Sequence, residues 1–177
     1  LPKLTNLQCR YNVPILEIIQ VRAPLRCLQL PYTGANLTDA PLLLTAKFVK
    51  TLQELHLACG ARSVLRLLEL PHLQTLRLQL DTAYIGEVPA QAVTASALTH
   101  LIISSPTGRE QDAMGLFSGA RMPKLTTLTL SDSVLSSRLV QTITNCAPNV
   151  NVLDISTFCK CGAAGLKPLA TWSRLKQ

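Results

Sequence analysis

Leucine-like residues recur along the chain in a fixed triplet, at positions i, i+3 and i+5. Seven triplets begin at residues 4, 25, 52, 73, 98, 125 and 150, so successive copies start 21 to 27 residues apart. They are Leu4, Leu7 and Cys9; Leu25, Leu28 and Leu30; Leu52, Leu55 and Leu57; Leu73, Leu76 and Leu78; Leu98, Leu101 and Ile103; Leu125, Leu128 and Leu130; and Val150, Leu153 and Ile155. Self-similarity at a period of this length is typical of stacked repeats rather than of a conventional globular fold.

Each triplet predicts a chain that turns a corner into a short strand. A helix needs steps of three and four and a strand needs steps of two, so a step of three followed by a step of two indicates a change of structure. In LPHLQTLRLQL at 70–80, Pro71 is expected to stop a helix, Leu73 to turn inward, and the leucines after it to alternate along a strand. Prolines at 2, 24, 71, 123 and 148 stand one or two residues ahead of a triplet, where they can end a helix.

The segments between triplets have helical spacing in three places. These are 37–51, 134–147 and, more weakly, 109–120. Thr38 or Asp39 is the expected N-cap of the first helix, and Asp132 or Ser133 that of the helix at 134–147. Each helix would cover the back of the strand before it. The pattern therefore predicts a parallel sheet on one side and helices on the other, in which no copy buries its apolar face alone.

Seven copies in register resemble the leucine-rich repeat proteins, and the resemblance covers essentially the whole chain. It implies an α/β fold, a single solenoid or horseshoe of about seven repeats over 1–177, with the sheet on the concave side and the helices on the convex side. The stretch 145–170 resembles the cysteine-containing subclass common in F-box proteins, because Cys146 lies four residues before the first anchor of its copy. A solenoid that starts on a strand motif without a polar cap is expected to lack its N-terminal cap or to be a fragment of a longer chain.

Composition indicates an aliphatic core and an intracellular protein. Leucine supplies 34 of 177 residues and aromatic residues only 4%, so the core must be built from aliphatic side chains. No run approaches the roughly 18 apolar residues that cross a bilayer, and the opening LPKLTNL lacks the features of a secretory signal. Six cysteines are scattered without the regular framing of small secreted domains, which favours reduced thiols in the cytoplasm, the nucleus or an organelle.

Residues capable of catalysis form no recognisable set. His56 and His100 are expected on strands two repeats apart, about 10 Å between backbones, where exposed surface histidines are the simpler interpretation. Cys159 and Cys161 are the sharpest local signal, but a zinc site needs about four ligands and only Cys146 is nearby. No glycine-rich phosphate loop occurs. We therefore predict no enzymatic activity, metal or cofactor, and an enzyme that uses the cysteine pair and a histidine ranks third among the alternatives.

The residues that alternate with the anchors predict the binding surface. On the concave side these residues are polar and small, and their charges nearly cancel, with Arg10 and Arg77 against Glu54 and Asp154. The predicted partner-binding residues are Gln8, Gln29, Glu54, His56, Thr75, Arg77, Gln79, His100, Ile102, Thr129 and Asp154. The family resemblance implies a non-enzymatic scaffold or adaptor that binds a protein segment there, as F-box-like ubiquitin ligase receptors do, although no F-box is visible in this chain.

The net charge of +7 must lie away from this surface. After Asp154 the chain carries Lys160, Lys167, Arg174 and Lys176 and no acid. Clustered cations gain by releasing counterions from a polyanion, so this basic surface predicts contact with RNA, an acidic protein or a membrane surface. A solvated face that caps the solenoid is the equally weighted alternative. The rival function is a structural subunit of a large ribonucleoprotein or organellar complex, without base stacking, because aromatic residues are few.

Overall fold

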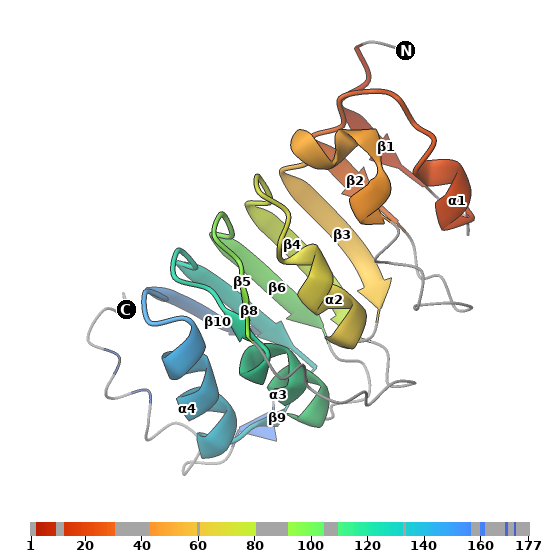
Figure 1. Ribbon diagram of the computed structural model, residues 1–177. Helices are drawn as coiled ribbons and strands as arrows, with labels where there is room; N and C mark the ends of the chain where they lie inside the picture. The colour runs from red at the N-terminus through yellow and green to blue at the C-terminus, as the bar shows by residue number, and fades with distance from the viewer. Residues whose placement is uncertain are drawn as a thin grey trace.

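A computed structural model shows an α/β fold built on one parallel sheet (Figure 1). It describes residues 3–9, 13–30, 43–59, 61–80, 92–104, 110–132, 134–156, 160–161, 169 and 172. The seven strands of the main sheet are β1 (Asn6–Gln8), β2 (Cys27–Gln29), β3 (Glu54–Cys59), β4 (Thr75–Leu80), β6 (His100–Ser104), β8 (Thr127–Ser131) and β10 (Val152–Ser156). They lie side by side in chain order, and every neighbouring pair is parallel. The predicted α/β fold with a parallel sheet is confirmed.

Helices and two short strand pairs connect these strands. The helices are α1 (Ile15–Ile18), α2 (Ala61–Leu67), α3 (Glu110–Ser118), α4 (Ser137–Cys146) and the 3-10 helix η2 (Lys47–Lys50). The short strands pair in parallel, β5 (Val93–Thr94) with β7 (Ala120–Arg121) and β9 (Val134–Leu135) with β11 (Lys160–Cys161). Figure 1 shows α2, α3 and α4 along one face of the main sheet. No helix in the described ranges has the length and hydropathy that a bilayer crossing needs.

The middle residue of each predicted triplet lies in a strand of the main sheet, and these residues face one another across the strands. This leucine row consists of Leu7, Leu28, Leu55, Leu76, Leu101, Leu128 and Leu153. Backbone bonds recur ahead of the strands. The N–H groups of Gln74 and Thr75 both donate to the Gln53 carbonyl, at 2.8 and 3.0 Å. Likewise, Thr99 and His100 donate to the Gln74 carbonyl at 2.9 and 3.0 Å.

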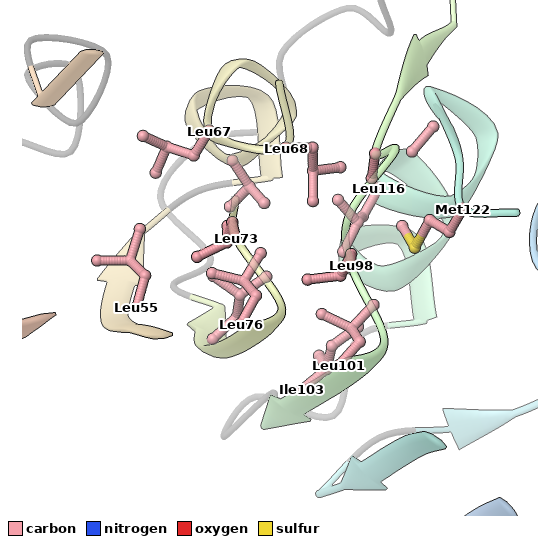
Figure 2. Close-up of a cluster of buried hydrophobic side chains, with 14 of the residues drawn as sticks. Leu55, Leu67, Leu68, Leu73, Leu76, Leu98, Leu101, Ile103, Leu116 and Met122 are labelled. Atoms are coloured by element: carbon pink, nitrogen blue, oxygen red, sulfur yellow. The ribbon is translucent and has the colours of Figure 1, made fainter. Parts of the chain in front are cut away.

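The core is aliphatic and lies between the leucine row and the helices. The five inner members of the row are 0% exposed, whereas the end members Leu7 and Leu153 are only partly buried. Figure 2 shows Leu76 from the sheet in one cluster with Leu67 of α2 and Leu116 of α3. Because alternate residues of a strand point to opposite faces, the register directs every second side chain into this core.

Helices α2 and α3 approach each other closely at Gly119, the residue that follows α3. A Cβ atom built on Gly119 would lie 2.7 Å from Leu65 Cδ1 and 3.3 Å from the Gly115 carbonyl oxygen. Leu65 is 3% exposed, so its side chain has little room to move away. The absence of a side chain at Gly119 therefore lets the end of α3 pack against α2.

The helix predicted over 37–51 is wrong in the part that the structure describes. Residues 43–51 form 3-10 turns, including η2, instead of a continuous α-helix. The expected N-caps Thr38 and Asp39 lie outside the described residues. By contrast, the helices predicted over 109–120 and 134–147 are confirmed by α3 and α4.

Side chains explain why the first of these segments does not continue as an α-helix. Val49 and Thr51 are β-branched, and such residues lose rotamer freedom in an α-helix. The Thr51 hydroxyl donates to the carbonyl of Phe48 at 3.0 Å and to that of Leu25 at 2.8 Å. The segment is thereby tied to the preceding β2 region, and Phe48, which is 1% exposed, enters the core.

The N-cap of α4 is Ser136, and the predictions of Asp132 or Ser133 are wrong. Ser136 has an extended backbone, and its Oγ accepts a hydrogen bond from the Leu139 N–H at 3.1 Å. The same hydroxyl donates to Glu110 Oε1 on α3. Asp132 has a φ angle of 56° and turns the chain directly after β8, a left-handed conformation that aspartate tolerates better than most residues. Ser133 lies outside the described residues.

Replacing Ser136 with alanine is expected to lower the free energy of unfolding by about 1 kcal/mol. The change removes the acceptor for the Leu139 N–H and the bond to Glu110 that joins α4 to α3. Urea denaturation followed by circular dichroism measures the loss. Ser136→Thr keeps the hydroxyl and should remain close to wild type. Equal stability of the alanine and threonine variants would show that the cap contributes nothing.

Candidate functional site

The face of the main sheet opposite the helices carries three rows of side chains, which together we call the polar face. The first row is Asn6, Cys27, Glu54, Thr75, His100, Thr127 and Val152. The second row is Gln8, Gln29, His56, Arg77, Ile102, Thr129 and Asp154. The third row is Ala58, Gln79, Ser104 and Ser131. All eleven residues predicted to bind a partner lie in these rows, and their role in binding stays a prediction.

On β4 and β8, side chains on the polar face are exposed or half-buried, whereas side chains on the opposite face are buried. On β4, Arg77 and Gln79 are exposed, while Leu76 and Leu78 are 0% and 1% exposed. On β8, Thr127, Thr129 and Ser131 are half-buried between fully buried leucines. This alternation makes the sheet one-sided, with an aliphatic face toward the helices and a hydrogen-bonding face toward solvent.

Charges on the polar face are few and lie apart. The rows contain one guanidinium, that of Arg77, and two carboxylates, those of Glu54 and Asp154. Arg10, which also entered the predicted charge balance, lies outside the described residues. No hydrogen bond or ion pair joins Arg77 or Asp154 to another side chain in the part of the chain that the structure describes. Both side chains are exposed.

His56 lies beside Arg77 in the second row, and the charge of Arg77 changes the pKa of His56. Burial lowers the pKa of His56 below its ordinary value of 6.5, and the positive charge of Arg77 lowers it further, while Glu54 raises it to a smaller extent. The imidazole therefore remains mostly neutral at pH 7. A neutral imidazole can accept one hydrogen bond and donate another, so it offers a ligand both functions.

Replacing Arg77 with glutamine is expected to raise the pKa of His56 toward its ordinary value. The change removes the neighbouring positive charge but leaves the burial, so the return should be partial. An NMR pH titration of the His56 ring measures the shift. Arg66→Gln removes an exposed charge on α2 and should leave this titration unchanged. An unaltered His56 titration in the Arg77 variant would contradict the contact.

The two histidines of the polar face do not form one pocket. His56 lies in the second row on β3, whereas His100 lies in the first row on β6, and β4 separates the two strands. The hydroxyl of Thr99 lies 2.9 Å from His100 Nδ1, so the ring has a hydrogen-bond partner of its own. The two imidazoles therefore have different neighbours, Arg77 for His56 and Thr99 for His100.

The described thiols are held in the protonated form. Burial raises the pKa of Cys9 and of Cys27, and the Cys27 sulfur accepts a weak bond from the Gln29 amide at 3.8 Å. Cys146 is buried in α4, donates to the Ile143 carbonyl at 3.4 Å, and has its pKa raised to about 12. A thiol is a weak nucleophile and metal ligand until it loses its proton.

The structure brings no metal-ligand set together among the residues that it describes. No group of three or more histidine, cysteine, aspartate or glutamate side chains lies close enough to hold an ion there. Cys159 falls outside the described residues, and Cys161 belongs to β11. The predicted absence of a metal site at the cysteine pair stays a prediction.

The predicted basic surface lies mostly outside the described residues. Lys160 begins β11, which pairs with β9 rather than with the main sheet, while Lys167, Arg174 and Lys176 are not described. Other exposed cations belong to the connecting segments between the main strands. They include Arg66 on α2, Arg121 on β7, Lys124 ahead of β8 and Arg138 on α4.

The sequence interpretation missed a contact of Trp172, the single tryptophan of the chain. Its indole N–H donates to the hydroxyl of Thr144 on α4. Leu169 and Trp172 also pack against the hydrophobic core. Trp172, which follows the last triplet in the part of the chain predicted only to carry a basic surface, therefore contacts α4. A lone tryptophan after the last triplet was the available signal.

No family model, curated protein or solved structure matches this chain.

Proposed function

We propose that this chain is a leucine-rich-repeat solenoid that works as a non-enzymatic scaffold, and that it binds a segment of a partner protein across the polar face. The observation that carries the proposal is the shared register of the seven main strands. Because of this register, the one to three polar residues of each strand form continuous rows on the side away from the helices. A segment that lies across the strands can then contact many copies of the triplet at once.

The chemistry of the polar face supports binding better than catalysis. Its amides and hydroxyls donate and accept hydrogen bonds, and its few charges are separated. The described thiols are protonated, and among the described residues no hydrogen bond joins a serine or cysteine to either histidine of the polar face. The Thr99 hydroxyl lies 2.9 Å from His100 Nδ1, but it also donates to the Gln74 carbonyl at 3.1 Å. Nucleophilic catalysis needs such a base within hydrogen-bond reach of the nucleophile.

Affinity purification from the native cell, followed by mass spectrometry, tests the proposal when it is run with matched variants. A partner that wild type captures should be lost with the double variant Arg77→Ala and His100→Ala on the polar face. It should be retained with Arg66→Ala and Arg121→Ala, which remove two exposed cations from the connecting segments. Retention with the first pair and loss with the second would refute the proposal.

A second function, as a structural subunit that contacts RNA or an acidic partner, is supported by the net charge of +7 and the sequence pI of about 9.4. Binding of this kind depends steeply on salt, because it releases counterions. Retention on immobilised RNA that disappears at moderate salt, and that persists with Arg77→Ala and His100→Ala, would favour this second function over the first.

A further inference from the structure

The second row of the polar face changes its chemistry from strand to strand. It presents amides on β1 and β2, the imidazole of His56 on β3 and the guanidinium of Arg77 on β4. It continues with the aliphatic Ile102 on β6, a hydroxyl on β8 and the carboxylate of Asp154 on β10. A positive, an apolar and a negative position therefore follow one another across the sheet.

The Arg77 end of this row fits an acidic side chain. Arg77 is exposed and has no ion-pair partner among the described residues. His56 lies beside it across the strands, and Thr75 and Gln79 flank it on β4, so hydrogen-bond donors surround the guanidinium. A carboxylate is the ligand that a guanidinium binds best, through two parallel hydrogen bonds.

The other end of the row fits a basic side chain. Asp154 is exposed on β10, and no described side chain forms an ion pair with it. Thr129 and Ile102 separate Asp154 from Arg77 in the row and carry no charge. The two opposite charges therefore attract different parts of a ligand.

The distance between these charges matches an extended peptide. Three strand spacings separate Arg77 on β4 from Asp154 on β10, which corresponds to about 14 Å. An extended peptide rises about 3.3 Å per residue and directs every second side chain to the same face. Positions one, three and five of such a peptide span about 13 Å and all face the row.

We propose that the polar face recognises an extended segment with an acidic residue, an apolar residue and a basic residue at alternate positions. The acidic side chain binds Arg77 with His56 beside it, the apolar side chain covers Ile102, and the basic side chain binds Asp154. This assignment rests on the proposed function, because it names the partner chemistry of the same surface.

Three synthetic pentapeptides test the assignment. The first has glutamate, leucine and lysine at positions one, three and five, with threonine between them. In the second, glutamine replaces the glutamate, and in the third, glutamine replaces the lysine. Each is titrated at low salt into the isotopically labelled full chain, and the shifts of assigned NMR signals give the affinity. Each peptide is also made in reversed order, so that either chain direction is sampled.

We expect each exchange of a peptide charge to weaken binding to wild type but not to the variant that lacks the matching protein charge. Exchanging glutamate for glutamine should weaken binding about two- to fivefold with wild type, and should have no effect with Arg77→Gln. Exchanging lysine for glutamine should weaken binding to a similar extent, and should have no effect with Asp154→Asn. Arg66→Gln and Glu69→Gln, which change exposed charges at α2 and just after it, should leave both differences intact.

Failure of the assignment differs from failure of the proposed function. If all the peptides shift the signals of the polar face equally, the face binds a segment but the charge pattern is wrong. If no peptide shifts those signals, the assignment is overturned, and the purification experiment then decides whether the face binds protein at all. If the charge exchanges have the same effect in the Arg77 and Asp154 variants as in wild type, the charges bind elsewhere and the assignment is also overturned.

Discussion

Replacing Leu78 with aspartate is expected to unfold the protein at room temperature. Leu78 lies in β4, is 1% exposed, and points into the core between the sheet and the helices. Losing a buried leucine side chain costs about 2–5 kcal/mol, and the new carboxyl group would lose its water without gaining a partner. Together these losses approach the whole stability of a typical domain, about 5–15 kcal/mol. Circular dichroism at 25 °C should show the loss of folded signal.

The adjacent residue provides the matched control. Gln79 follows Leu78 on the same strand but is exposed on the polar face. Gln79→Asp should therefore lower the free energy of unfolding by about 0.5 kcal/mol or less. Urea denaturation of the two variants compares the two faces of one strand directly. Similar losses in both variants would contradict a sheet with one buried and one open face.

Replacing Phe117 with alanine should lower the free energy of unfolding by about 3–5 kcal/mol. Phe117 lies in α3, is 1% exposed, and is among the largest fully buried side chains of the protein. The substitution leaves a cavity in the hydrophobic core that the neighbouring side chains only partly fill. Chemical denaturation measures the change.

Phe117→Leu is the appropriate comparison for this cavity. Leucine keeps the position apolar and fills much of the volume, so the loss should be about 1.5 kcal/mol or less. If Phe117→Ala were as stable as Phe117→Leu, the helix layer would not be tightly packed on the sheet, and the burial of α3 would be wrong.

The main sheet was predictable from the sequence because its signal is repeated. Each triplet combines a corner with two aliphatic residues at strand spacing, and Leu76 and Leu101 occupy the same place in their copies. A single copy of this pattern would be ambiguous. Seven copies at similar intervals also predicted the alignment of the strands, which set Leu76 opposite Leu101.

The connecting segments were less predictable because their structure depends on tertiary contacts. The segment before β3 forms 3-10 turns, in which the Thr51 hydroxyl bonds a carbonyl near β2 that is distant in sequence. Helix α2 was not predicted, although Val64, Leu65 and Leu68 have helical spacing, because the pattern extends over only about two turns. The cap of α4 at Ser136 also bonds Glu110 on another helix.

Strand alternation predicted which residues lie on the polar face, but which of them lie side by side depends on the register of the strands. His56 follows the first anchor of its copy by four residues and His100 by two, so the two histidines fall in different rows. That difference is present in the sequence, and both histidines lie on the polar face, as predicted. The effect of Arg77 on the pKa of His56 depends on burial, which spacing alone does not predict.

The main strands lie in chain order, so among the described strands each inner one is paired on both sides and each end one on one side only. Opening β1 breaks one set of cross-strand contacts, whereas opening β4 breaks two. Partial exposure of Leu7 is consistent with this difference. In this chain β1 and β10 can thus open while β4 stays paired, and their amide hydrogens should exchange before those of the central strands. A molecule frayed at β1 still presents His56, Arg77 and Ile102 in their places.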